Sequence, residues 1–194
     1  LFLPFNEGRL QWPPGGAMFL RARDGWPLHQ RPLPGLVCEQ TFKPEADALS
    51  NAGLAVNSKD APKTYELVLI LPPRQRDEAR ALMARAVAMT KPGGRIIACQ
   101  SNDEGARSSE ADLTQLTGEV ESMSKNKCRV FWTATLARLN FSLLTHWQSL
   151  DQPRPIADGR FMSRPGIFAW DRIDVASALL AEHLPANLAG GRPP

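Results

Sequence analysis

The chain has 194 residues, a net charge of +3, 43% hydrophobic and 22% charged residues. This is the composition of a globular protein with a core, not of a disordered or fibrous chain. No run of about 18 apolar residues is present, so we expect no membrane-spanning helix. The mild positive charge permits an RNA partner without requiring one. Because the sequence begins at Leu1 and not at Met, we expect part of the natural amino terminus to be missing.

The cysteines and histidines are scattered along the chain, at Cys38, Cys99, Cys128, His29, His146 and His183. They form no C-x-x-C pair and no ligand spacing typical of zinc, so we expect neither a disulfide framework nor a metal site. The sequence also lacks a secretory signal. Together these features predict a protein of the reducing cytoplasm.

The first third of the chain predicts short elements between loops rich in proline and glycine. Residues 1–16 predict an irregular entry. Strands are expected over residues 17–22, 36–39 and 54–56, and a helix over residues 44–52. The helix begins at a proline and is followed by Gly53, which is typical of a helix end.

The clearest unit is a strand, a helix and a second strand in the middle of the chain. Glu66–Leu71 is a continuous apolar run, which is typical of a parallel strand covered on both faces. Arg74–Thr90 carries the apolar stripe of an amphipathic helix, and Lys91–Gly94 predicts its end. Arg95–Gln100 is the next strand. This order is that of a right-handed βαβ crossover.

The last third predicts a short helix over residues 109–117 capped by Ser109, a strand over residues 127–133, and a linker at residues 151–155. A further helix is expected after Asp171 as its cap, and Pro185 is expected to end it. The pattern as a whole predicts an α/β, Rossmann-like fold with a doubly wound, mostly parallel sheet over residues 1–150.

The junctions between strands and helices carry no complete catalytic or cofactor motif. Gln40–Pro44 and Pro72–Arg74 contain no glycine, so neither predicts a cradle for a phosphate or an adenosyl group. A G-x-S-x-G nucleophile turn is also absent, so the sequence predicts no hydrolase triad.

Two polar segments are candidates for binding. The loop Ser101–Glu110 follows a strand, where Asn102 and Arg107 can meet a ligand; the alternative is a solvated loop that caps the next helix. The cations Lys125, Lys127 and Arg129 share a short segment with the aromatic residues Phe131 and Trp132, which is typical of an RNA-contacting edge; the alternative is an ordinary edge strand.

Two stretches resemble a known family. Leu71–Glu110, with LPPRQRDEARALMARAV, KPGGRIIACQ and NDEGARSSE, is similar to the amino-terminal domain of the bacterial small-subunit ribosomal RNA guanine-N2 methyltransferases. The tail RPGIFAWDRIDVASALLAEHLP resembles the segment that joins the two halves of those proteins. The resemblance extends over most of the chain from about Ala17 onward.

The resemblance implies two tandem Rossmann-like domains, of which this chain is the degenerate, amino-terminal copy of the class I methyltransferase fold. In the family the carboxyl-terminal copy binds S-adenosylmethionine at an Asp-x-Gly-x-Gly turn and methylates through Asn-Pro-Pro-Phe after its fourth strand. Here the corresponding turn is Leu71-Pro72-Pro73-Arg74, which lacks the amide and the aromatic ring. We therefore expect no catalytic residue in this chain and no cofactor bound to it alone.

The family's linking segment matches this chain at Phe168, Asp171 and Ser177. The resemblance implies that these residues lie beside S-adenosylmethionine in the full-length protein, and the alternative for Phe168 is packing of the helix on a core. Residues 151–194 are then the linker and first helix of a catalytic domain that is absent from this chain.

The resemblance thus implies the non-catalytic half of an RNA methyltransferase. The expected partners are ribosomal RNA and the protein's own catalytic domain, and a face that docks on that domain can also produce homodimers. Two alternatives stay open. One is a stand-alone module that binds RNA or protein, and the other is a small enzyme that uses the Ser101–Glu110 loop.

Overall fold

A computed structural model describes residues 1–58 and 61–184. The chain divides into two compact units, Leu1–Asp151 and Gln152–Pro194, and each is described by itself. That the second unit begins a catalytic domain stays a prediction.

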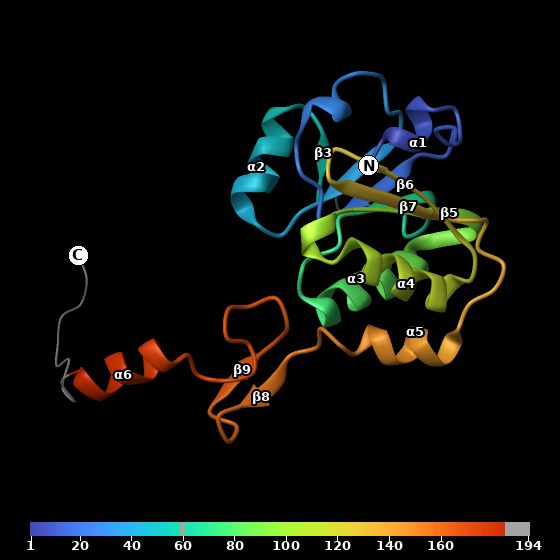
Figure 1. Cartoon of the computed structure of the whole chain (residues 1–194). Helices are drawn as coiled ribbons and strands as arrows, with labels where there is room; N and C mark the ends of the chain where they lie inside the picture. The colour runs from blue at the N-terminus through green and yellow to red at the C-terminus, as the bar shows by residue number, and fades with distance from the viewer. Residues whose placement is uncertain (59–60, 185–194) are drawn as a thin grey trace. The chain divides into compact units, whose positions relative to one another are not determined.

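The first unit is built on a seven-stranded sheet with the order β3-β2-β1-β4-β5-β7-β6 (Figure 1). The strands are β1 (Ala17–Leu20), β2 (Leu36–Glu39), β3 (Ala55–Val56), β4 (Tyr65–Ile70), β5 (Thr90–Ser101), β6 (Val120–Lys125) and β7 (Cys128–Thr133). The first five pair in parallel, and β7 runs antiparallel to both of its neighbours. The predicted α/β fold with a doubly wound, mostly parallel sheet is therefore confirmed.

Helices cover both faces of this sheet (Figure 1). They are α1 (Leu3–Asn6), α2 (Lys43–Asn51), α3 (Arg76–Met89), α4 (Ala106–Thr117) and α5 (Phe141–Gln148), with short 3-10 helices at Trp26–Leu28 and Asn102–Glu104. The core on one face joins apolar residues of α3, α4 and α5. The core on the other face joins residues of α1 and α2. Successive residues of β4 alternate between the two cores, with Val68 and Ile70 in one and Leu67 and Leu69 in the other.

Several elements differ from the sequence-based expectation. Gln75 caps α3, since its side chain accepts a hydrogen bond from the Glu78 backbone N–H at 2.5 Å. The expected stop at Lys91–Gly94 belongs to β5, which starts at Thr90 and pairs there with Tyr65 before the register shifts. The helix expected from Ser109 begins three residues earlier, at Ala106, and Ser109 is buried within it.

Three further elements were not predicted. β6 is an edge strand with a polar sequence, and it pairs with β7 along its whole length. The eight residues of α5 are too few to show a clear helical period, although Asn140 caps the helix by accepting from the Leu143 backbone N–H at 3.1 Å. The irregular entry expected over residues 1–16 contains α1, whose buried residues contribute to the second core.

A buried carboxylate ties the helices of one face together. Asp112 on α4 is 1% exposed and receives paired hydrogen bonds of 2.9–3.0 Å from Arg76 and Arg80 of α3. The Arg80 guanidinium also lies 5.1 Å from the ring centroid of Trp147 on α5. Burial raises the pKa of Asp112, but the hydrogen bonds from the two arginines outweigh it, so its pKa lies below the ordinary value.

Two glycines allow the backbones that lead into β1 and β2 to approach each other closely. A Cβ on Gly16 would lie 2.4 Å from the carbonyl oxygen of Gly35, and a Cβ on Gly35 would lie 2.8 Å from Cα of Gly16. Both residues also have positive φ, at 80° and 69°. The Ala17 backbone N–H donates to the Gly35 carbonyl at 3.1 Å, which starts the pairing of these strands.

The second unit contains a hairpin and a helix. The hairpin joins β8 (Arg154–Ile156) to β9 (Phe161–Ser163), and the helix is α6 (Val175–His183). The predicted cap Asp171 is wrong, because Asp174 caps α6 by accepting from the Ser177 backbone N–H at 3.1 Å. Asp171 instead pairs with Arg172 at 3.0 Å. The expected stop at Pro185 lies outside the described residues.

Candidate functional site

A cavity of about 220 Å³ lies at the edge of the sheet where the parallel strands end. This is the edge at which α/β folds bind ligands. The chain segments that follow β1, β4 and β5 meet there with the start of β7. Its lining consists of Arg21, Arg23, Leu71, Pro72, Pro73, Arg74, Cys99, Gln100, Ser101, Glu104 and Cys128.

The Leu71–Arg74 turn forms one wall of this cavity, directly after β4. β4 is the fourth strand of the chain, as the resemblance implies for this turn. Pro72 and Pro73 are buried, whereas Arg74 is exposed. The Leu71 side chain packs against the second core and offers no hydrogen-bonding group. The turn therefore presents a guanidinium in place of an aromatic ring, and no amide from its first position.

Arg21 connects the end of β1 to this turn. Its guanidinium Nη1 donates to the Leu71 carbonyl at 3.0 Å, across 50 positions of sequence. Its backbone has a φ of 50°, in the left-handed region that residues other than glycine adopt rarely. Burial is the main cause that lowers the pKa of Arg21, and the nearby charge of Glu78 opposes it. The junction of the first and fourth strands thus holds a protein cation.

Gln100, at the end of β5, is the most unusual group in the lining. The residue is 4% exposed, and its Nε2 donates to the carbonyls of Pro73 at 3.2 Å and Glu104 at 2.9 Å. Among the described residues its Oε1 has no hydrogen-bond donor, although it is buried. The sequence analysis missed Gln100, Arg21 and Arg23. The available signal was a polar residue at or just after the end of an apolar run, as Arg21 follows β1 and Gln100 lies in the last two residues of β5.

The loop Ser101–Glu110 has less of a binding character than its sequence suggested. Residues 102–104 form a 3-10 helix, and Gly105, with a φ of 99°, leads into α4. Asn102 and Arg107 are both exposed. Neither side chain lines the 220 Å³ cavity, so the structure does not bring these two residues into the candidate site.

The three cations Lys125, Lys127 and Arg129 lie in different parts of the hairpin of β6 and β7. Lys125 ends β6, Lys127 lies in the turn with a φ of 61°, and both are exposed. Arg129 lies on β7 and pairs with Glu110 on α4 at 2.7 Å, with its side chain 23% exposed. Two of the three predicted cations are therefore accessible, and the third is largely neutralised.

The aromatic residues of this strand are not available to RNA. Phe131 and Trp132 are 0% and 2% exposed and belong to opposite cores. The expectation of an edge strand is wrong, because β7 lies inside the sheet between β5 and β6. Both of its faces are covered, so neither aromatic ring can stack on a base.

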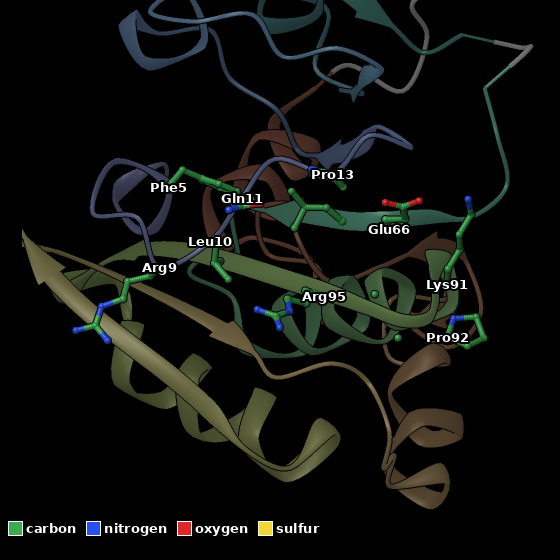
Figure 2. A pocket seen from close by; sticks show the side chains of 12 residues that line it. Phe5, Arg9, Leu10, Gln11, Pro13, Glu66, Lys91, Pro92 and Arg95 are labelled. Atoms are coloured by element: carbon green, nitrogen blue, oxygen red, sulfur yellow. The ribbon is translucent and has the colours of Figure 1, made fainter.

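A larger cavity, about 580 Å³, lies at the opposite, amino-terminal ends of β4 and β5. Figure 2 shows the lining residues Glu66 on β4, Lys91 and Arg95 on β5, and Arg9 and Gln11 from the segment before β1. Its cations Arg9, Lys91 and Arg95 form no salt bridge within residues 1–58 and 61–184. The volume of a cavity alone therefore does not identify the edge of the sheet at which this fold binds ligands.

The three residues expected beside a cofactor all lie in the second unit and are exposed. The Phe168 side chain is 83% exposed. Ser177 lies in the first turn of α6, where its hydroxyl is 3.3 Å from the Asp174 carboxylate. Within the described residues, no core surrounds Phe168. The alternative role for Phe168, packing of the helix on a core, is therefore not seen inside the second unit.

The described part of the chain holds no group of three or more acidic, histidine or cysteine residues arranged for a metal. None of its helices is long and apolar enough to span a membrane.

No protein-family model matches the chain, but three curated proteins that share one name are similar to it. It is 25% identical over 138 residues to the ribosomal RNA small subunit methyltransferase C of Pseudoalteromonas atlantica, which covers 70% of this chain and 40% of that protein. The protein of the same name from Serratia proteamaculans is 24% identical over 118 residues, or 61% of this chain and 33% of that protein. The chain spans less than half the length of these relatives.

Solved structures share the fold. The 16S rRNA N2 methyltransferase of T. thermophilus, solved in complex with AdoMet and guanosine, has a TM-score of 0.65 and 22% identity, covering 90% of this chain and 49% of that chain. The ribosomal protein L11 methylase of Lactobacillus delbrueckii subsp. bulgaricus has a TM-score of 0.51 and 11% identity, covering 68% and 76%. The seven-stranded, mostly parallel sheet is that of class I methyltransferases.

Proposed function

Because the chain is homologous to ribosomal RNA small subunit methyltransferases C over a portion of their length, we propose that it is the non-catalytic amino-terminal half of such an enzyme. The complete protein would use S-adenosylmethionine to methylate the N2 atom of a guanine in ribosomal RNA. This half would assist folding of the catalytic half and binding of RNA, in the cytoplasm.

The observation that carries the non-catalytic role is the turn after β4. A methyltransferase that acts on an exocyclic amine needs an acceptor to orient the amine, and the Leu71 side chain has none. The Arg21 guanidinium, bonded to the Leu71 carbonyl at 3.0 Å, places a cation at the same junction. S-adenosylmethionine carries a sulfonium charge, so this arginine opposes its binding.

The second unit supports a partner domain. α6 has no buried residue, and its apolar side chains Val175, Leu179 and Leu180 are 57–78% exposed. An apolar surface of this kind marks an interaction site. We assign it to the protein's own catalytic domain, with Phe168, Asp171 and Ser177 approaching the cofactor that this domain binds.

The RNA contact is assigned to the exposed cations of the first unit, Arg107, Lys125 and Lys127. Arg129 contributes less, because Glu110 neutralises it at 2.7 Å. Reversal of Lys125 and Lys127 to Glu is expected to weaken RNA binding and to flatten its dependence on salt, since fewer counterions are released. Unchanged binding would remove the hairpin from the RNA surface.

The direct test is calorimetry of this chain with S-adenosylmethionine, together with a methyl-transfer assay on ribosomal RNA. We expect no saturable heat and no incorporation of methyl groups. The full-length Serratia proteamaculans relative serves as the positive control. A saturable heat or transferred methyl groups would overturn the non-catalytic role.

The second candidate is a stand-alone module that binds RNA or protein, which the two-sided core of the first unit also supports. The gene sequence beyond Pro194 distinguishes the two. An Asp-x-Gly-x-Gly turn followed by Asn-Pro-Pro-Phe supports the methyltransferase, and a stop codon supports the module.

A further inference from the structure

The 220 Å³ cavity at the carboxyl edge of the sheet has the chemistry of a ligand site, although its catalytic residues are replaced. We propose that it binds one nucleotide of single-stranded RNA, with Arg23 and Arg74 on the phosphate and Gln100 Oε1 on a hydrogen-bond donor of the nucleoside. This inference rests on the proposed RNA partner and adds a second, separate contact to the Lys125 and Lys127 hairpin.

The charge of the lining selects an anion. Arg21, Arg23 and Arg74 line the cavity together with one acidic residue, Glu104. Other carboxylates act on these arginines from outside the lining: Glu78 on Arg21, Glu45 on Arg23 and Asp103 on Arg74. Arg21 is held by the Leu71 carbonyl, so it contributes charge from a fixed position. Arg23 is 63% exposed and reaches Glu45 only at 3.7 Å, a contact that solvent weakens. Arg74 is exposed, and its charge is close enough to Asp103 to help lower the pKa of that carboxyl. Both arginines can exchange these solvent-weakened interactions for a phosphate, whose oxygens match the guanidinium fork.

The buried amide of Gln100 selects a donor next to that anion. Its orientation is fixed, because rotation of the amide by 180° would bring Oε1 against the carbonyl oxygens of Pro73 and Glu104. Oε1 therefore remains an acceptor without a donor among the described residues. Unpaired buried acceptors are unfavourable, so a ligand hydroxyl or N–H that reaches this atom gains a hydrogen bond that the protein alone lacks.

The size of the cavity limits the ligand. Pockets that enclose drug-sized molecules measure about 300–1,000 Å³. At 220 Å³, the cavity suits part of a nucleotide better than a whole adenosyl cofactor. A phosphate beside a ribose hydroxyl or a base N–H satisfies both the arginines and Gln100. RNA offers this combination at unpaired positions, where the bases and sugars are accessible.

The test measures binding of 5′-fluorescein-labelled hexauridylate to the full chain, with 5′-UMP, uridine and inorganic phosphate as competitors. We expect 5′-UMP to compete better than either uridine or phosphate. Arg23→Gln and Arg74→Gln should each weaken 5′-UMP about tenfold, the scale of one lost charge-assisted hydrogen bond. Arg138→Gln is the matched control, because this exposed arginine does not line the cavity.

Gln100→Met tests the second contact, since it keeps the length of the side chain and removes the acceptor. It should weaken 5′-UMP and leave phosphate unchanged. If this variant does not fold, as judged by its thermal unfolding, the two exposed arginines still decide the proposal.

The outcomes separate this inference from the proposed function. If phosphate competes as well as 5′-UMP, or if both arginine variants bind 5′-UMP like the wild type, the nucleotide pocket is wrong. If hexauridylate binding is then lost on reversal of Lys125 and Lys127, the RNA role stands without the pocket. If the chain binds no RNA at all, both fail.

Discussion

The two units of the chain differ in how far their apolar side chains are buried. In the first unit, apolar side chains fill two cores on the two faces of one sheet. Among residues 152–184 of the second unit, nine large apolar residues are exposed, including Phe168 and Val175, and α6 buries none of its residues. A helix in water gains most of its stability from packing of an apolar face. The first unit therefore contains the apolar contacts that stabilise its elements, whereas α6 of the second unit needs an apolar surface from elsewhere to cover it.

If the first unit is the packed one, loss of a buried contact there should have a large effect on stability. The largest effect is expected from removal of the Asp112 carboxylate. We expect Asp112→Ala to lower the free energy of unfolding by about 3 kcal/mol, because two guanidinium groups lose a buried partner. The estimate is at the low end of the range for buried pairs because the Arg76 side chain is 58% exposed. Chemical denaturation measures it. Asp47→Ala, which breaks an exposed pair with Lys43, is the control and should cost no more than about 0.5 kcal/mol.

The same carboxylate predicts a dependence on pH. The folded-state pKa of Asp112 is lowered, so its stabilisation is complete above the unfolded pKa of about 3.9 and is lost as the pH falls through the folded pKa. The difference in unfolding free energy between wild type and Asp112→Asn should be constant above about pH 5 and shrink in more acidic solution. A difference that does not change down to pH 2 would contradict the role of the charge.

A smaller effect on stability is expected in the second unit. The double variant Leu179→Ser and Leu180→Ser should change the free energy of unfolding of the first unit by less than about 0.5 kcal/mol, as is usual for exposed positions. It should however reduce any self-association, which light scattering of the wild type and the variant measures. Cooperative loss of the first unit in this variant would show that the two units do not differ as described.

Reaction rates of thiols compare the exposure of one position in each unit, and we expect no change in stability from this test. Burial, and the charge of Asp24 to a lesser degree, raises the pKa of Cys38 to about 12. In a chain with Cys99→Ser and Cys128→Ser, Cys38 should react with a thiol reagent only when the first unit opens. A cysteine introduced by Val175→Cys should react at once, because Val175 is 78% exposed. Equal rates at the two positions would contradict the contrast.

The sequence was most informative where structure is local. β4, α3 and β5 follow one another, and their apolar periods are long enough to identify both the strand type and the helix. β6 and α5 were missed for the opposite reason. An exposed edge strand needs few apolar residues, and α5 owes its position to contacts of Trp147 with distant elements.

The candidate site was harder to predict, because it depends on which strand ends become neighbours. The Leu71–Arg74 turn was identified by its resemblance to a motif. Arg21 and Gln100 reach the same cavity only because β1, β4 and β5 lie side by side in the sheet. In the same way, alternation along β7 could not show that Phe131 and Trp132 are both buried, since an inner strand is covered on both faces.

The place of β1 in the sheet also has a consequence for synthesis on the ribosome. β1 is made before both of its neighbours in the sheet, and all four of its residues are buried. Its neighbour β4 lies far along the chain, with Phe19 opposite Leu69. At about 5–20 residues per second, β1 waits roughly 3–10 s before that partner is synthesised. During this interval β1 can pair only with β2, so the centre of the sheet is completed late in synthesis.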